Sequence, residues 1–238
     1  MVVSTEDIGW AKVKAFIANL IVEVTSVCNR ACTGCYAPNV VSNKSAAELM
    51  EKDASLFLDH NQLDAIFDNW TSYFPEIVSI RGGEPSLHPQ VVLIFEKLKK
   101  ISKTLIFETH GRWLLEKNRF SYKDLISGVK RNDVTVKISF DSMHGLKADE
   151  LREMTDFLTV QEIPFLVAIT ELTEIEFLQT RSLCSWIESD KIIFQKKSRT
   201  LENLIKPSIG VINAKGEFQE NLTAKFDIRE LIKEAVLC

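Results

Sequence analysis

Three cysteines lie close together near the start of the chain. Cys28, Cys32 and Cys35 have the spacing C-x3-C-x2-C, within the stretch IVEVTSVCNRACTGCYAP. Thiolates spaced this closely on one loop can converge on one metal centre. A closed structural zinc site has four protein ligands, whereas a site that does chemistry keeps one position free. Iron–sulfur clusters usually take four cysteines, so a cluster held by three leaves one iron open to a ligand that is not protein.

A second motif, Gly82-Gly83-Glu84-Pro85, follows at a distance. Two glycines let the backbone approach a ligand at positions where a Cβ atom would clash. Glu84 is an anion that can bind an ammonium group through a charge-assisted hydrogen bond. Alone, the four residues are more simply explained as a turn between a strand and a helix. Together with the cysteines they indicate a binding site.

The two motifs resemble those of the radical S-adenosylmethionine (SAM) superfamily, and the resemblance runs from about Asn19 to Lys196. It implies that Cys28, Cys32 and Cys35 hold a [4Fe–4S] cluster whose fourth iron binds the amino and carboxylate groups of SAM. It also implies an enzyme that cleaves SAM reductively to methionine and a 5′-deoxyadenosyl radical. The radical would abstract hydrogen from a peptide or a small molecule. An external electron donor, such as a flavodoxin or a ferredoxin, would be required.

The resemblance also names residues that would bind SAM. Gly82, Gly83 and Glu84 would lie along its methionine amino group. The family usually has an aromatic residue before the third cysteine, where this chain has Gly34, and Tyr36 is expected to substitute. Further contacts with SAM are expected from Thr109, His110, Ser139, Asp141, Ile169 and Gln195.

Several of these positions have structural alternatives. His110 replaces the Asn of a Thr-Asn-Gly sequence that is frequent in the family, and it either contacts SAM or substrate or caps its strand. Ser139 and Asp141 alternate with Phe140, so both are predicted to face the same side and to reach the ribose or the carboxylate of SAM. Asp141 alternatively caps the next turn. His144 either faces substrate or, more simply, is solvated.

Other functions remain open for the cysteine motif. A zinc site requires a fourth Cys or His nearby, yet the nearest His is His60 and no second C-x2-C pair exists. A disulfide framework is disfavoured because no secretory signal precedes the motif. A non-catalytic iron–sulfur or zinc protein would bind metal without SAM, and a redox sensor would use the same thiols reversibly. Glycyl-radical-enzyme activases are a further alternative, although the segment SFD departs from their typical D-x-K. Only Cys184 and Cys238 are left over, so a single cluster is predicted.

Strands and helices are predicted to alternate along most of the chain. Apolar runs rich in β-branched residues predict six strands, over 21–24, 76–80, 104–108, 134–140, 164–169 and 191–194. Helices are predicted over 45–69 with a break at 60–61, and over 89–101, 122–129, 147–158 and 173–188. His88 and Thr173 are predicted to cap two of these helices. Six such units predict an α/β fold, a partial (βα)6 TIM-like barrel, whose sites lie at the C-terminal ends of the strands.

The ends of the chain are predicted to lie outside the barrel. Residues 1–18 form an N-terminal extension with a short helix over 4–16, and residues 19–200 form the barrel. Residues 201–238 are expected to pack on it as a short hairpin over 207–220 and an amphipathic helix over 226–237.

The composition limits which binding partners and which cellular location are expected. Hydrophobic residues make up 45% of the chain, charged residues 26%, and the net charge is −4. This charge gives no general basic field, so duplex nucleic acid is not an expected partner. No apolar run reaches the roughly 18 residues that a membrane span needs. Cysteines that must stay reduced predict a cytoplasmic protein.

Overall fold

The computed structural model of the chain describes residues 19–32, 35, 40–68, 75–116, 122–171, 173–196, 209–212, 214–215 and 218–221. Four predictions lie outside these residues: the N-terminal helix over 4–16, the C-terminal helix over 226–237, and the positions of Tyr36 and Cys238. None of the helices in the described ranges is both long and apolar enough to cross a membrane.

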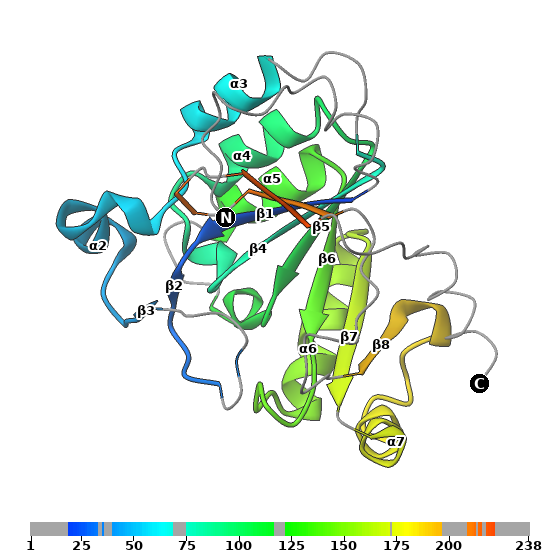
Figure 1. Ribbon diagram of the computed structural model, residues 1–238. Helices are drawn as coiled ribbons and strands as arrows, with labels where there is room; N and C mark the ends of the chain where they lie inside the picture. Colours follow the sequence, from blue (N-terminus) through cyan, green and yellow to red (C-terminus); the bar gives the residue numbers. More distant parts are fainter. Residues whose placement is uncertain are drawn as a thin grey trace.

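Six parallel strands form the centre of the sheet, in the order β1-β4-β5-β6-β7-β8 (Figure 1). They are β1 (Asn19–Thr25), β4 (Ile77–Gly82), β5 (Thr104–Thr109), β6 (Val134–Ser139), β7 (Phe165–Glu171) and β8 (Ile192–Lys196). Each strand is joined to the next along the chain by a helical crossover, which confirms the predicted α/β architecture. Within the described ranges β8 is an edge strand, so the sheet is an open, partial barrel.

The predicted hairpin is present, and it extends the sheet. Its strands β9 (Ile209–Ile212) and β10 (Phe218–Asn221) pair antiparallel. Strand β9 also pairs parallel with β1, in the register Asn19↔Ile209 to Val22↔Ile212, so the sheet order begins β10-β9-β1. Figure 1 shows the hairpin in orange beside β1. Its pairing with β1 had no counterpart in the sequence pattern, which located the hairpin but not its partner strand.

The helices differ from the predictions mainly at their ends. They are α2 (Ala46–Lys52), α3 (His60–Asp68), α4 (Val91–Leu98), α5 (Tyr122–Arg131), α6 (Ala148–Val160) and α7 (Glu174–Ser182). Short 3-10 turns occur at η1 (Ala54–Leu56), η2 (Pro85–Leu87), η3 (Arg112–Leu114) and η4 (Ser189–Lys191). The long predicted helix over 45–69 therefore breaks at Asp53, before the predicted break. Thr173 caps α7 as predicted, because its side chain accepts a hydrogen bond from Glu176 N.

The two faces of the central strands have different chemistry. Alternate residues such as Leu20, Val22 and Ile80 are fully buried against the helices, with Phe95 of α4 among their neighbours in the core. The residues between them face the other side of the sheet, because successive side chains on a strand point to opposite faces. Those residues include Glu23, Arg81, Glu108 and Lys137. The apolar face holds the strands in place, and the charged face is available to a ligand.

His88 does not cap α4 as predicted, because that helix begins three residues later, at Val91. Its ring instead joins two segments: Nδ1 accepts a hydrogen bond from Gln90 N (3.0 Å), and Nε2 lies 2.9 Å from the carbonyl of Leu58. Burial lowers the pKa of His88 to about 4, against the opposing effect of the Leu58 carbonyl. The neutral ring is therefore the form that the fold stabilises.

This histidine makes the stability of the fold depend on pH. The pKa of His88 is about 4 in the folded protein, against 6.5 for an unperturbed histidine. The unfolded chain therefore binds more protons between these values, and stability falls as the pH drops through them. We predict that lowering the pH from 7 to 4 costs about 3 kcal/mol through this residue. Urea unfolding of the metal-free protein measures the effect, and His88→Gln should show a correspondingly flatter pH dependence. Equal pH dependence in both proteins would contradict the assignment.

Candidate functional site

A cavity of about 280 Å³ lies at the C-terminal ends of the central strands. It brings together the cysteine loop, the glycine motif and the ends of β5, β6 and β7. This size is close to the lower limit of about 300 Å³ for ligand pockets. The lining residues are Cys28, Arg30, Cys32, Cys35, Arg81, Gly82, Gly83, Glu84, Glu108, Thr109, His110, Lys137, Ser139, Met143, His144 and Thr170.

The first cysteine of the motif is anchored by backbone pairing. Cys28 ends the two-residue strand β2 (Val27–Cys28), which pairs with β3 (Val40–Val41), and its carbonyl accepts from Ser42 N (2.9 Å). Cys28 is buried, whereas Cys35 is exposed. Burial raises the pKa of the Cys28 thiol to about 11, although the backbone N–H of Arg30 opposes this. The metal-free site therefore holds a protonated Cys28, and a metal must displace that proton to bind.

The donor set fits a cluster held by three thiolates. All three cysteines line the same cavity and are free thiols. Among the described residues no three His, Cys, Asp or Glu side chains converge on one ion position. In a [4Fe–4S] cluster each thiolate binds a different iron. Cys28, Cys32 and Cys35 are therefore the residues that would hold a cluster.

The two glycines of the second motif pack directly against the cysteine loop. A Cβ atom on Gly83 would lie 2.1 Å from the carbonyl oxygen of Val27, and one on Gly82 would lie 2.3 Å from that of Thr25. The backbone N–H of Gly83 donates to Thr25 O (2.7 Å), and that of Glu84 donates to Val27 O (2.8 Å). The close approach that requires glycine here is thus to the chain itself. Contact of the glycines with a ligand stays a prediction.

The Glu84 carboxylate is buried and largely bonded to the protein. One oxygen accepts from Ser86 N (3.0 Å) and from the hydroxyl of Thr109 (2.7 Å), and the other accepts from His110 N (3.1 Å). The Thr109 hydroxyl in turn accepts from Gly111 N and from Trp113 Nε1. Thr109 therefore orients Glu84, and its hydroxyl is occupied by these bonds. This is a different role from the predicted contact with SAM.

Asp141 is not among the residues that line the cavity, whereas Ser139 is. Strand β6 ends at Ser139, so the alternation does not continue, and Ser139 lines the cavity while Asp141 does not. The Asp141 carboxylate is fully buried and accepts from Met143 N (3.0 Å), His144 N (3.0 Å) and His144 Nδ1 (2.7 Å). These are the contacts of the alternative interpretation, a cap on the next turn. They place His144 in the cavity wall.

Several charged residues on the strands line the cavity but were not predicted from the sequence motifs. Arg81 Nη2 lies 3.1 Å from Glu23, and Lys137 Nζ lies 3.2 Å from Glu108. Burial opposes ionisation of Glu108, but Lys137 and Arg81 outweigh it, so the pKa of Glu108 lies below its usual range. A charged residue inside an otherwise apolar strand, such as Lys137 in VTVKISF, is the sequence signal that identifies such positions. On β7, Thr170 lines the cavity, whereas Ile169 is buried in the core.

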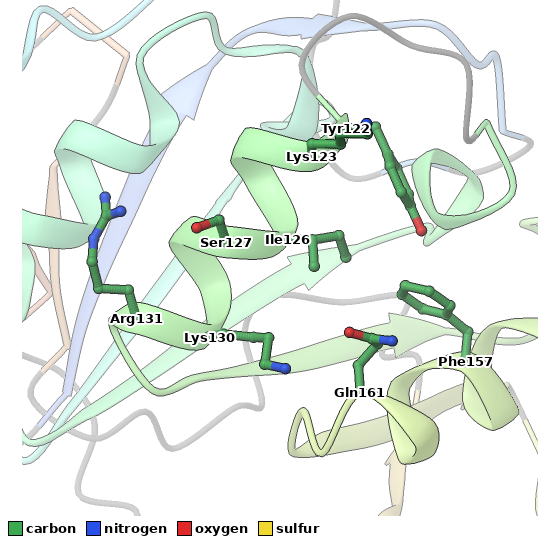
Figure 2. A pocket seen from close by; sticks show the side chains of 8 residues that line it. All are labelled: Tyr122, Lys123, Ile126, Ser127, Lys130, Arg131, Phe157 and Gln161. Carbon is green, nitrogen blue, oxygen red and sulfur yellow. The ribbon is translucent and has the colours of Figure 1, made fainter.

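A second cavity, of about 590 Å³, lies between α5 and the end of α6. Figure 2 shows its lining, with Tyr122 and Ile126 facing Phe157 and with three cationic side chains on α5. Those cations are Lys123, Lys130 and Arg131. None of the lining residues belongs to either motif, and the helices carry no cysteine there. The smaller cavity at the strand ends is therefore the candidate active site.

The packing of the glycine motif gives a prediction about Gly83. In Gly83→Ala, the new Cβ meets the Val27 carbonyl, so we expect a loss of about 3 kcal/mol in the free energy of unfolding and failure to take up iron. Gly145→Ala is the control, because its nearest atom would lie 3.5 Å away and only its φ of +55° is unfavourable. That control should cost about 1 kcal/mol and leave iron uptake intact. Equal effects of both substitutions would contradict the packing role.

Comparison with known proteins identifies the family. A model of the radical SAM superfamily matches residues 22–158, more than half of the chain. No curated protein matches. Among solved structures, the fold is similar to Streptococcus suis SuiB bound to its precursor peptide SuiA, with a TM-score of 0.52 and 15% identity over 95% of this chain and 48% of that chain. It is also similar to Escherichia coli coproporphyrinogen III oxidase (HemN), a radical SAM enzyme, with a TM-score of 0.56 and 11% identity over 82% of this chain and 49% of that chain.

These structural likenesses establish the fold, and the family match establishes the superfamily. The chain spans about half the length of the two solved structures. The matched segment begins within β1 and ends within α6, so it includes both the cysteine loop and the glycine motif. The chain belongs to the radical SAM superfamily, whose cofactors are a [4Fe–4S] cluster and SAM.

Proposed function

We propose that this chain is an enzyme that cleaves SAM reductively and abstracts hydrogen from a peptide or small-molecule substrate. When bound, the cluster supplies the electron that cleaves SAM to methionine and a 5′-deoxyadenosyl radical, the species that removes hydrogen from the substrate. The observation that carries the proposal is one cavity lined by Cys28, Cys32, Cys35 and the Glu84 carboxylate. The family match supports it, because the match spans all four residues.

Glu84 would accept a hydrogen bond from the amino group of SAM. An ionised carboxylate offers about four acceptor positions, and three are used by Ser86 N, the Thr109 hydroxyl and His110 N. One position is therefore left for a hydrogen bond from an N–H of the SAM amino group, which the charge of the carboxylate strengthens. Glu84 is buried, which excludes water and strengthens such a bond.

The charged side of the sheet would receive the polar part of SAM or of the substrate. Arg30, Arg81 and Lys137 contribute cations to the cavity wall, and Glu108 contributes an anion beside Lys137. Ser139 and Thr170 add hydroxyl groups from β6 and β7. This lining suits a ligand with carboxylate and hydroxyl groups. Contact of Ser139 with SAM is part of the proposal, whereas the two ring nitrogens of His110 are engaged by Arg112 N and by Asn29 beside the SAM site.

The substrate class is proposed from the fold and from one relative. The SuiB structure is described as bound to a precursor peptide, and its likeness to this chain supports a peptide as one class of substrate. Because that likeness shows the fold alone, a small molecule is equally part of the proposal. An electron donor of the flavodoxin or ferredoxin kind is required, since the chain holds thiols for only one predicted cluster. The cytoplasmic location, the lack of duplex nucleic acid binding and the domain boundaries at 18 and 200 stay predictions.

The proposal is tested by anaerobic reconstitution of the protein with iron and sulfide, followed by SAM and dithionite. We expect about four irons per chain and formation of 5′-deoxyadenosine. Cys32→Ala should form no nucleoside, because one of the three cluster ligands is removed. Cys184→Ala is the matched control: Cys184 is buried in the core, away from the cavity lining, and its removal should leave nucleoside formation intact.

Three outcomes would contradict the proposal. Four irons per chain without SAM binding or cleavage would indicate a non-catalytic iron–sulfur protein. A tightly bound zinc ion with no cluster would mean that the cysteines form a structural site. If nucleoside forms only in the presence of a glycyl-radical enzyme, the activase alternative would replace the proposed direct action on a substrate.

A further inference from the structure

The imidazole of His110 joins the two halves of the candidate site. His110 is the residue directly after β5, and it is buried. Its ring lies between the Glu84 carboxylate and Asn29, the residue after Cys28. We propose that His110 is a positioning residue that holds the cysteine loop in place and keeps one acceptor position of Glu84 open. This inference rests on the proposed function, in which the cysteine loop binds the cluster and Glu84 binds the amino group of SAM.

The hydrogen bonds define which ring nitrogen carries the proton. Arg112 N donates to Nδ1 of His110 (3.1 Å), so Nδ1 is an acceptor and the proton of the neutral ring is on Nε2. Burial lowers the pKa of His110, against the opposing charge of Glu84, which favours the neutral ring. Nε2 lies 3.0 Å from Asn29 Oδ1 and 3.2 Å from Glu84 Oε2. The single proton on Nε2 is therefore within reach of both oxygens, and the hydrogen bond is directed to Asn29.

This choice of partner matters for Glu84. If the Nε2 proton turned to Glu84, it would take the last of the four acceptor positions of that carboxylate. Asn29 Oδ1 binds the proton instead, so the fourth position stays available to a ligand. Asn29 thus acts on Glu84 through His110, although it lies on the cysteine loop.

The same bond connects the end of β5 to the cluster loop. Backbone hydrogen bonds from Gly83 and Glu84 hold residues 25 and 27, and Ser42 N holds the carbonyl of Cys28. The bond from His110 is the side-chain contact that reaches Asn29, the first residue after Cys28. Groups that orient metal ligands in this way typically change metal affinity by about 10–100-fold when they are removed.

Two substitutions separate this role from simple packing. His110→Asn keeps an acceptor near Nδ1 for Arg112 N but is too short to reach Asn29. His110→Gln is longer and places an amide donor near the position of Nε2. A positioning role therefore predicts that Gln substitutes for His and that Asn does not, even though Asn is the residue frequent in the family at this position. Asn29→Ala breaks the same bond from the other side.

The experiment measures iron release from the anaerobically reconstituted protein to the chelator ferrozine, without SAM. We expect release about 10-fold faster in His110→Asn and in Asn29→Ala, and within about 2-fold of the unmodified protein in His110→Gln. The double variant His110→Asn with Asn29→Ala should be no faster than either single variant, because both remove one bond. His88→Asn, which alters a similar turn outside the cavity, should release iron at the unmodified rate.

The inference is overturned if His110→Asn and Asn29→Ala release iron at the unmodified rate, or if His110→Gln is as fast as His110→Asn. Urea unfolding of the metal-free variants shows whether each one folds. If His110→Asn does not fold, the iron release of Asn29→Ala tests the inference. Failure of the proposed function looks different, because the unmodified protein would then take up no cluster or would not cleave SAM. Normal SAM cleavage with unchanged iron release in all variants would overturn the role of His110 alone.

Discussion

The site depends on two backbone hydrogen bonds that join the segment before Cys28 to the glycine motif, between residues 58 and 57 positions apart in the chain. Gly83 N donates to Thr25 O and Glu84 N donates to Val27 O, at 2.7 and 2.8 Å. No side chain larger than hydrogen fits between these segments, because a Cβ on Gly83 would lie 2.1 Å from the Val27 carbonyl. The cysteine loop and the glycine motif are therefore one structural unit. Its position at the C-terminal ends of parallel strands follows from the α/β fold, in which the strands are held by an apolar face and ligands bind at those ends.

The buried polar groups at these strand ends are hydrogen-bonded to one another within the protein. Glu84 is oriented by Thr109 and by the backbone of His110, and Asp141 Oδ1 accepts hydrogen bonds from its own turn and from His144. Burying a carboxylate is costly unless it is hydrogen-bonded, so each accepts several N–H or O–H groups. Glu84 is left with one open acceptor position, whereas Asp141 Oδ2 is buried and accepts no hydrogen bond. A carboxylate with one open position selects its partner by charge and geometry, which suits an N–H donor such as the amino group of SAM.

The sequence predicted the fold more completely than the site. Six apolar strands were found because alternation and β-branched residues report burial, and the hairpin was found from its turn. The pairing of β9 with β1 was not predictable, since parallel pairing of distant segments leaves no local pattern. In the site, the cysteines and Glu84 were recognisable by spacing and residue type. The absence of Asp141 from the cavity lining was not predictable, because it depends on where β6 ends. Thr170 lines the cavity instead of Ile169 because neighbouring residues of β7 face opposite sides of the sheet.

The central claim is that three cysteines leave one iron of the cluster open to the amino group of SAM. Electron–nuclear double resonance of the dithionite-reduced cluster, with SAM labelled with ¹⁵N at the methionine amino group, tests this claim most directly. The account predicts a change in the cluster signal on addition of SAM and a hyperfine coupling to the labelled nitrogen. A cluster signal that is unchanged by SAM and shows no ¹⁵N coupling would contradict it.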